Sequence, residues 1–345
     1  MRIEHLRQRL REQGAKLAHE QLVLRSWANA RALDTTRRGS PDDHFPARLR
    51  ADLPALTAEL AALARVRSEH PGEDGSARLL VELADGHSVE SVLLPRDGVC
   101  VSTQVGCAVG CTFCMTGRDG LLRQLGSAEI VAQVVLARAR RPVKKVVFMG
   151  MGEPAHNIDN VLEAIEFLGT AGAIGHKNLV FSTVGDHRVF ERLPLGPVKP
   201  ALALSLHTTR AELRAQLLPR APRIDPAELT ALASDYARKT GYPVQYQWTL
   251  LDGVNDGDDE VAGIVRLLKG QYAVMNLIPY NSVEGPGYRR PPRERIDAMA
   301  RKLQAAGILT KLRQSAGQDV DGGCGQLRAR IAVMRPARRD AAAQP

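Results

Sequence analysis

Three cysteines, Cys107, Cys111 and Cys114, stand close together in the sequence with the spacing C-x3-C-x2-C. A glycine precedes each of the first two, and glycine allows the backbone to curl so that neighbouring side chains can face one point. Thiolates are the ligands that zinc, copper(I) and iron–sulfur clusters prefer. Because three cysteines leave one coordination position open, the spacing indicates a metal centre that takes part in chemistry.

A zinc site completed by His156 or His207 is an alternative for the same cysteines. Closed zinc sites usually combine two short Cys or His units, and the sequence contains no second unit. Three buried free thiols that only fill the core are another alternative, which Gly110 and Thr112 between the cysteines disfavour. The sequence therefore favours an open metal centre over both.

The cysteines follow an apolar stretch, residues 99–105, that we predict to be the first strand of a strand–helix alternation. Further strands are predicted at 144–149, 179–183, 201–206, 244–250, 273–278 and 309–312. The helices predicted between them lie at 127–140, 157–172, 226–241, 258–269 and 293–306. This alternation is typical of a parallel sheet. The predicted fold class is α/β, with a partial (β/α)6 barrel over residues 99–315.

Polar residues follow four of these predicted strands at the point where each strand ends. They are Glu153 after Gly152, Ser182, Ser205 followed by Leu206 and His207, and Asn281. In barrels of this kind the carboxyl ends of the strands carry the active site. Loop capping would explain one such residue alone, but four coincident strand ends predict a ligand site beside the cysteines.

The region before the barrel is predicted to have two parts, a helical accessory domain at residues 1–75 and a β-hairpin at residues 76–98. Leucines at helical spacing indicate the helices, and one helix is expected to begin at Pro54. Residues 68–76 are expected to form a polar connector. A group of arginines is explained equally by a solvated helical face and by a surface that grips RNA: Arg37, Arg38, Arg48 and Arg50.

After the barrel, residues 316–335 carry Cys324 in a glycine-rich segment, in which the cysteine is free to move and present its sulfur. Residues 336–345 are predicted to form a disordered tail. Structural burial of Cys324 and of Cys100 is the alternative interpretation of these two remaining cysteines.

Charge, hydropathy and cysteine content indicate which classes of protein fit this sequence. The 345 residues include 47 Lys plus Arg against 38 Asp plus Glu, a net charge of +9, which fits a nucleic-acid partner but also follows from GC-rich coding DNA. No apolar run approaches the roughly 18 residues of a membrane span, and the N-terminus lacks the apolar core of a secretory signal. Five cysteines, three of them clustered, argue against a secreted disulfide scaffold. We therefore expect a cytoplasmic protein with no membrane partner.

Residues 88–326 resemble the RlmN/Cfr family of radical S-adenosylmethionine (SAM) RNA methyltransferases. The matching pieces are Cys100-Val-Ser-Thr-Gln-Val-Gly-Cys107, the three clustered cysteines, Gly150-Met-Gly-Glu-Pro, Ala203-Leu-Ser-Leu-His207, Asn276-Leu-Ile-Pro-Tyr-Asn281 and Gly323-Cys324-Gly-Gln-Leu. The C-x3-C-x2-C loop alone indicates only a radical SAM enzyme. The seven-residue step from Cys100 to Cys107, together with the late Cys324, is far more specific.

The resemblance implies two cofactors. A [4Fe–4S] cluster would be held by Cys107, Cys111 and Cys114, and two SAM molecules would be used in each turnover. The residues that would contact SAM are Gly152, Glu153, Ser182, Ser205, Leu206, His207 and Asn281. Reduction of the cluster would need an electron donor such as flavodoxin or ferredoxin, and the enzyme is expected to be a monomer.

The resemblance also implies catalytic roles. Cys324 would become methylated and carry the methyl group as a carbon radical to an adenine carbon of RNA. Glu90 would accept the proton from that carbon, although a solvated strand carboxylate is its local alternative. Cys100 would resolve the protein–RNA adduct and form a transient disulfide with Cys324. The expected target is carbon 2 of an adenine in 23S ribosomal RNA, with transfer RNA as a further substrate.

Two other functions stay open on the sequence. One is methylation of adenine at carbon 8, as in the antibiotic-resistance branch of the same family. The other is a zinc-dependent RNA-binding protein without catalysis.

Overall fold

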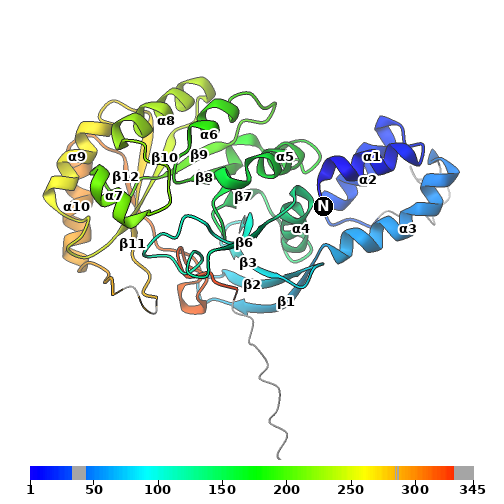
Figure 1. Cartoon of the computed structure of the whole chain (residues 1–345), viewed down its shortest axis with the longest axis horizontal. Helices are drawn as coiled ribbons and strands as arrows, with labels where there is room; N and C mark the ends of the chain where they lie inside the picture. Colours follow the sequence, from blue (N-terminus) through cyan, green and yellow to red (C-terminus); the bar gives the residue numbers. More distant parts are fainter. Residues whose placement is uncertain (33–43, 284, 286, 330–345) are drawn as a thin grey trace, which may run out of the picture.

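The computed structural model describes residues 1–32, 44–283, 285 and 287–329. Its centre is a ten-stranded sheet with the order β1-β2-β3-β4-β7-β8-β9-β10-β11-β12 (Figure 1). Two further strands, β5 (Gln104–Gly106) and β6 (Leu121–Gln124), pair with each other in a small separate sheet. Within the described residues, β1 and β12 each pair on one side only, so the large sheet is open.

Seven strands form a parallel series within the large sheet. They are β4 (Gly98–Cys100), β7 (Lys145–Phe148), β8 (Leu179–Thr183), β9 (Ala201–Ser205), β10 (Val244–Leu250), β11 (Ala273–Pro279) and β12 (Thr310–Leu312). Every neighbouring pair in this series is parallel. Their apolar runs are buried, as expected where helices cover a parallel sheet. The α/β class and the partial barrel are confirmed.

Helices connect these strands. They are α4 (Ser127–Arg138), α5 (Ile158–Gly169), α6 (His187–Arg192), α7 (Ala211–Leu217), α8 (Pro226–Thr240), α9 (Asp258–Leu268) and α10 (Arg293–Ala305). Local signals are clear in α8, where Asp225 caps the first turn and Gly241 ends the helix with φ 71°. The sequence did not predict α6 and α7, because helices this short show too little periodicity.

The part of the sheet before β4 is antiparallel, and it contains the predicted β-hairpin together with one strand that was not predicted. The hairpin is β2 (Ala77–Leu83) and β3 (Ser88–Leu94), and the added strand is β1 (Ala64–Pro71). The expected helix end and polar connector are therefore wrong, because β1 occupies most of those residues. The reason is that β1 is an edge strand whose side chains are largely polar and partly exposed. Such a strand resembles a loop in composition.

The predicted strand 99–105 is also interrupted, because the chain leaves the sheet after Cys100 and pairs again only from Gln104. The side chain of Gln133 replaces the missing sheet partner of Ser102. Its Oε1 accepts from the Ser102 N–H at 2.8 Å, and its Nε2 donates to the Ser102 carbonyl at 2.9 Å. This bend separates Cys100 from the cysteine loop.

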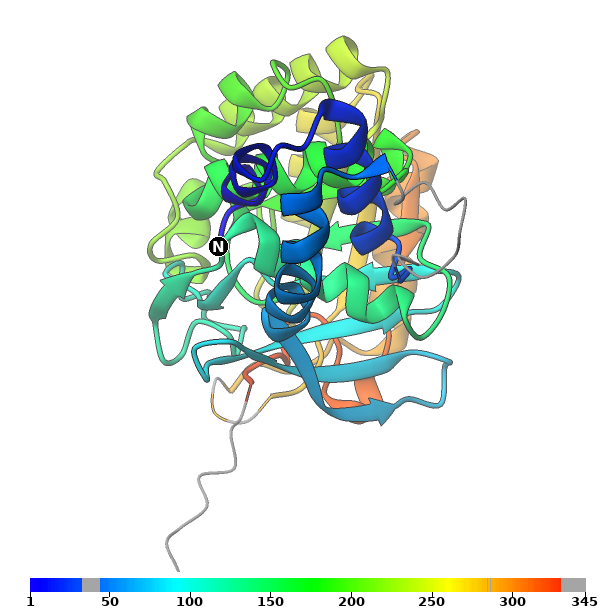
Figure 2. The same cartoon turned by 90° about the vertical axis from the view of Figure 1, so that its right-hand side faces the viewer.

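In residues 1–32 and 44–63, which the structure describes, three α-helices precede the sheet: α1 (Ile3–Glu12), α2 (Leu17–Ala28) and α3 (Ala47–Ala62). Pro54 lies inside α3, which begins earlier than predicted. Figure 2 shows α3 leading into β1. The Ile3 N–H donates to Ser127 Oγ at 2.8 Å, and the apolar side chains of the three helices belong to the same continuous core as the sheet. Arg37, Arg38 and the tail 336–345 lie outside the described residues.

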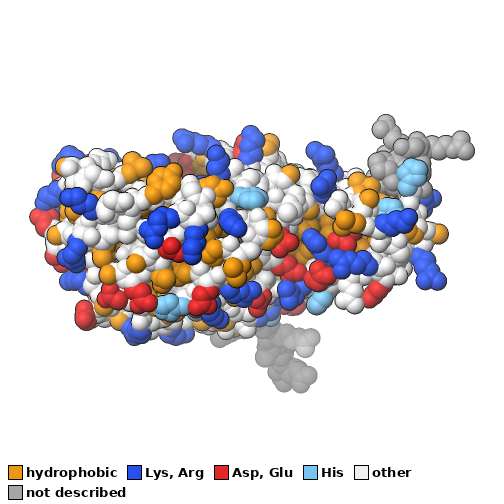
Figure 3. Space-filling view, turned by 90° about the horizontal axis from the view of Figure 1, so that it is seen from above, with side chains coloured by type: hydrophobic (Ala, Val, Ile, Leu, Met, Phe, Trp, Pro, Cys, Tyr) orange, Lys and Arg blue, Asp and Glu red, His pale blue; other side chains and the backbone are white. Residues whose placement is uncertain are grey.

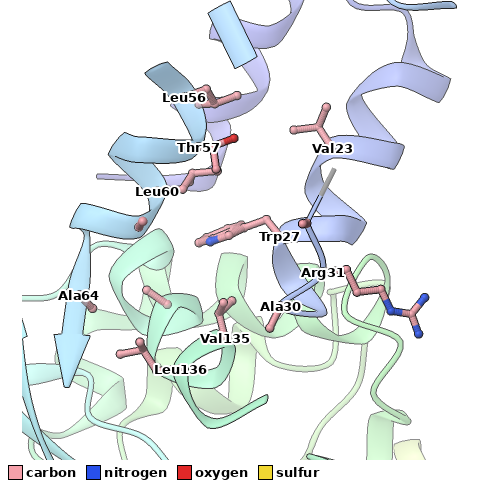
Figure 4. Close-up of a pocket in the computed structure, with 13 residues that line it drawn as sticks. Val23, Trp27, Ala30, Arg31, Leu56, Thr57, Leu60, Ala64, Val135 and Leu136 are labelled. Carbon is pink, nitrogen blue, oxygen red and sulfur yellow. The ribbon is translucent and has the colours of Figure 1, made fainter. Parts of the chain in front are cut away.

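An apolar hollow of about 260 Å³ lies where α2, α3 and α4 meet (Figure 4). Trp27, Leu60 and Leu136 are among the side chains around it. None of the predicted site residues lines this hollow, so it belongs to the packing of the N-terminal helices rather than to the predicted ligand site.

The surface seen in Figure 3, which looks down on the upper side of Figure 1, carries Lys and Arg side chains among acidic and apolar ones. The basic excess is therefore not gathered into a single patch on this face. Across the described part of the chain, every helix is too short or too polar to cross a bilayer.

Candidate active site

Cys107, Cys111 and Cys114 lie in a tight loop that follows β5. The loop folds closely because Gly117 lies against Gly110, where a Cβ atom on Gly117 would come within 2.7 Å of the Gly110 Cα. The N–H of Thr112 donates to the Leu217 carbonyl oxygen at 3.0 Å, which ties the loop to the end of α7. The three cysteines thus lie in a small turn that is anchored to α7.

Cys107 is buried, Cys111 and Cys114 are partly buried, and negative charges lie near them. Burial raises the pKa of Cys107 to about 12 and raises the pKa of Cys111 well above its usual value. The charges of Cys114 and Glu153 raise both pKa values further. Thiolates must form before they bind metal, and a metal's positive charge offsets this repulsion. The donor set therefore fits a metal-bound group.

The described residues contain no preformed site for a single metal ion. Among the described residues, no three or more His, Cys, Asp or Glu side chains gather closely enough to hold one metal ion. A tetrahedral zinc site requires such convergence. In a [4Fe–4S] cluster each thiolate binds a different iron atom, so the sulfurs stand wider apart.

His207 does not complete a zinc site either. Its Nδ1 accepts from the Thr249 N–H at 3.0 Å, so Nε2 carries the proton of the neutral ring and has no lone pair for a metal. Burial lowers the pKa of His207 to about 3, which keeps the ring neutral. The ring meets Phe113 of the cysteine loop edge to face, with centroids 5.0 Å apart.

Glu153 lies beyond the end of β7, where the sequence predicted it. Its carboxylate accepts from the N–H groups of Ala155 and Val184, each at 3.0 Å. Burial raises its pKa to about 6. Gly152 before it has φ 102°, and a Cβ atom there would come within 2.6 Å of the Gln104 side chain. Only glycine allows this approach.

The other predicted strand-end residues lie on neighbouring strands. Ser182 lies in β8 and Ser205 ends β9, both partly buried, while Leu206 is fully buried. His207 adopts φ 62°, a strained conformation for a residue with a side chain. Parallel pairing of these strands brings their carboxyl ends to one edge of the sheet.

Arg214 on α7 is a site residue that sequence reasoning missed. It is 4% exposed, and its Nη2 donates to the carbonyls of Val184 and Ser205. Its buried Nε has no hydrogen-bond partner in the described structure. Burial lowers the pKa of Arg214 to about 10, while the charges of Cys111 and Glu153 act in the opposite direction. A buried cation with an unused donor is suited to an anionic ligand.

The segment that carries Cys324 packs onto the cysteine loop. The Met115 N–H donates to the Gly325 carbonyl at 2.7 Å, and Thr116 Oγ1 donates to the Leu327 carbonyl at 2.7 Å. Asn281, after β11, donates from Nδ2 to the Cys324 carbonyl at 3.0 Å, while its buried Oδ1 has no partner in the described residues. Residues more than 200 positions apart thus meet at one place.

Cys100 and Cys324 have different environments. Cys100 ends β4 and is buried, and this burial raises its pKa to about 12, with a further contribution from the charge of nearby Cys324. Cys324 has an exposed side chain, although the surrounding loops displace enough water to raise its pKa. All five cysteines are free thiols. The interpretation of both as buried structural thiols is wrong for Cys324.

Glu90 is not the solvated strand carboxylate of the local alternative, because it is 2% exposed. It lies on β3, where one carboxylate oxygen pairs with Arg78. The other oxygen accepts from the N–H groups of Arg328 at 2.7 Å and Ala329 at 3.0 Å. The carboxylate therefore touches the segment that carries Cys324.

Comparison with known proteins agrees with this geometry. Residues 101–267 match the model of the radical SAM superfamily. A protein of Aromatoleum aromaticum named "Probable RNA methyltransferase" is 77% identical over 331 residues, which cover 96% of this chain and 93% of the relative. A Pseudomonas aeruginosa protein of the same name is 66% identical over 345 residues, which cover 100% of both. The chain belongs to the radical SAM RNA methyltransferase family.

A solved structure supports the same assignment. The crystal structure of a radical SAM methyltransferase from Sphaerobacter thermophilus has a TM-score of 0.84 and 35% identity, and the match covers 96% of this chain and 98% of that one. The radical SAM superfamily uses a [4Fe–4S] cluster and SAM. In this chain the three clustered cysteines, Glu153 and Arg214 offer suitable groups for them.

Proposed function

We propose that this enzyme methylates carbon 2 of an adenine in 23S ribosomal RNA, with transfer RNA as a further substrate, through a methylated Cys324. The observation that carries the proposal is the packing of the Cys324 segment on the cysteine loop. The backbone of Gly325 is hydrogen-bonded to Met115, next to Cys114. A methyl group on Cys324 would thus lie close to the place where the cluster and SAM generate a radical.

Each of the three catalytic side chains would act in turn. Cys324 takes a methyl group from the first SAM, and S-adenosylhomocysteine leaves. When bound, the cluster and the second SAM supply a 5′-deoxyadenosyl radical, which removes a hydrogen atom from that methyl group. The methylene on Cys324 then bonds to carbon 2 of adenine. Glu90 would accept the proton from carbon 2, and a cluster held by Cys107, Cys111 and Cys114 would supply the acceptor for the remaining unpaired electron.

Cys100 would resolve the adduct. Its thiolate attacks the Cys324 sulfur, so that the sulfur–carbon bond breaks, a disulfide forms and the departing carbon takes the electron pair and then a proton. This route has a chemical reason, because carbon 2 of adenine is electron-poor and cannot attack the methyl group of SAM. Reduction of the disulfide by a cellular thiol would restore the enzyme.

The methionine part of SAM would be bound between Glu153 and Arg214. Glu153 would accept from the SAM ammonium group, and the unused Nε of Arg214 would donate to its carboxylate. The predicted contacts at Gly152, Ser182, Ser205, Leu206, His207 and Asn281 line the same strand ends. The exposed Arg48 and Arg50 on α3 would help the N-terminal helices bind RNA.

Anaerobic reaction of the reconstituted enzyme with SAM, a reductant and unmodified ribosomal RNA tests the proposal. Mass spectrometry of the digested RNA should show 2-methyladenosine, and Cys324→Ala should yield none. 8-Methyladenosine would instead assign the enzyme to the carbon-8 branch. Formation of 5′-deoxyadenosine without a methylated adenosine would exclude an adenine of this RNA as the substrate.

Cys100→Ala tests the resolving role separately. The purified variant should carry covalently bound RNA that RNase releases and denaturant does not. Turnover at the normal rate by a variant free of RNA would remove that role from Cys100.

A further inference from the structure

One ion pair of the antiparallel hairpin contacts the Cys324 segment on both sides of the cysteine. Arg78 on β2 pairs with Glu90 on β3, and both side chains are largely buried, with 19% and 3% exposed. Arg78 Nε donates to the Val320 carbonyl at 2.5 Å, four residues before Cys324. Glu90 accepts from the N–H groups of Arg328 and Ala329, four and five residues after it.

The turn between β1 and β2 contributes further contacts on the first side. Asp74 accepts from the Gly317 N–H at 3.1 Å, and Asp319 accepts from the Glu73 N–H at 3.0 Å. Figure 1 shows the C-terminal segment lying against this end of the hairpin. Between the two attachments, only a few hydrogen bonds hold the chain, including those from Asn281 and Met115.

We propose that Arg78 is a positioning residue, and that its ion pair with Glu90 is a releasable clamp that holds the Cys324 loop over the cluster. The proposal deepens the proposed function, because it rests on Cys324 as the methyl carrier and Glu90 as the proton acceptor. In the clamped state the Glu90 carboxylate contacts Arg78 and the two backbone amides, and these three contacts together with the Arg78–Val320 hydrogen bond fix both ends of the loop.

The clamp links the proton transfer to the next step of the reaction. A Glu90 that has taken the proton from adenine is neutral, so it attracts Arg78 less and accepts more weakly from the two amides. The loop ends are then released, and Cys324 is free to turn towards the buried Cys100. If the loop were released before the proton transfer, the adduct would move away from Glu90. The protonation state of the Glu90 carboxylate therefore sets the order of the two steps.

Hydrogen exchange on the cluster-loaded full chain, without RNA, tests the clamp. Glu90→Gln mimics the neutral acid, and Arg78→Met removes the other half of the pair. Each variant should speed amide exchange in residues 317–322 and 326–329 by about tenfold or more, because released segments exchange through local opening. The double variant should be no faster than the singles. Alkylation of Cys324 by iodoacetamide should accelerate in the same variants.

Arg65→Met is the matched control. Arg65 pairs with Glu82 across β1 and β2 of the same hairpin at 2.6 Å, and no recorded hydrogen bond or ion pair joins it to the Cys324 segment. In the Arg65→Met variant, amide hydrogen exchange in residues 317–329 should equal that of the unchanged protein. Arg78→Lys, which keeps the charge but loses the second donor, should restore part of the protection.

Three outcomes would overturn the clamp. The first is unchanged amide exchange of residues 317–329 in both single variants, and the second is an additive increase of exchange in the double variant. The third is an equal loss of protection across β2 and β3, which would mean that the ion pair only stabilises the hairpin. These readings involve no turnover, so the clamp can fail while 2-methyladenosine is still formed. Conversely, absence of methylated RNA would remove the proposed function while leaving the measured clamp intact.

Discussion

The two ends of the large sheet hold their cysteines in different ways. On the parallel side, the predicted SAM-binding positions follow buried strands. Beside them, the cysteine loop follows β5 of the small sheet, and Val109 and Phe113 of the loop are buried in an apolar cluster. On the antiparallel side, the Cys324 segment is held by the Arg78–Glu90 pair and a handful of backbone hydrogen bonds. A cluster must stay in place through many turnovers, whereas a methyl carrier must move between partners. Accordingly, apolar packing stabilises the cysteine loop that would hold the cluster, whereas polar contacts that can break hold the segment that carries Cys324.

The largest effect is expected from Cys111→Ala on the parallel side. Two remaining thiols cannot hold the cluster, so iron content and visible absorbance after reconstitution should fall to less than about a tenth of the normal value, and product formation should cease. Iron and sulfide assays with an absorption spectrum measure this.

Cys324→Ala is the counterpart on the antiparallel side. It should lose product equally but keep its iron, because Cys324 is not a cluster ligand in this assignment. Loss of iron in both variants would contradict the separation of the two regions.

The next effect concerns Cys100, the thiol proposed to form a disulfide with Cys324. The pKa of Cys100 is raised to about 12, so at pH 7 its thiolate fraction is small and rises tenfold with each pH unit. In cluster-loaded protein with glutathione attached to Cys324, glutathione release should therefore accelerate about 100-fold between pH 7 and pH 9. Chromatography of the released thiol gives the rate.

Cys100→Ser provides the baseline for that measurement, and it should release no glutathione. A rate that levels off before pH 9 would show that Cys100 has the ordinary thiol pKa of about 8.5.

Arg214→Met should weaken SAM binding about 30-fold, corresponding to about 2 kcal/mol for a lost charge-assisted contact. The reason is that Arg214 has an unused buried Nε donor, and its charge interacts with those of Cys111 and Glu153. Equilibrium dialysis with labelled SAM on cluster-loaded protein checks this. Arg214→Lys should recover part of the affinity, and unchanged binding in both variants would leave the arginine a purely structural cation.

The parallel side was predictable because its signals are local. Buried apolar runs separated by helices gave the strands of the barrel, and polar residues after those runs gave Glu153 and Asn281. Arg214 was missed because an arginine in a short helix carries no periodic or motif signal, and only its burial reveals it. The partners of Glu90 were missed for a different reason, since Arg328 and Arg78 meet it only through tertiary pairing.

The antiparallel side was predicted less well because one of its three strands, β1, is largely polar. β1 was taken for a helix end and a connector, since its exposed face alternates charged residues instead of apolar ones. The bend after Cys100 depends on Gln133, 33 residues later, which no local pattern links to Ser102. Contacts of this kind become visible only when the chain is folded.

The smallest predicted effect measures how strongly the two regions are joined. Thr116 Oγ1 of the cysteine loop donates to the Leu327 carbonyl at 2.7 Å, and Thr116→Val keeps the shape of the side chain while removing this donor. The free energy of unfolding should fall by about 1 kcal/mol, because one buried carbonyl loses its partner. Urea unfolding of the cluster-free variant gives this value, and iron content after reconstitution should stay normal. A much larger loss would mean that the Cys324 segment is part of the rigid core, in conflict with a loop that must be released in each turnover.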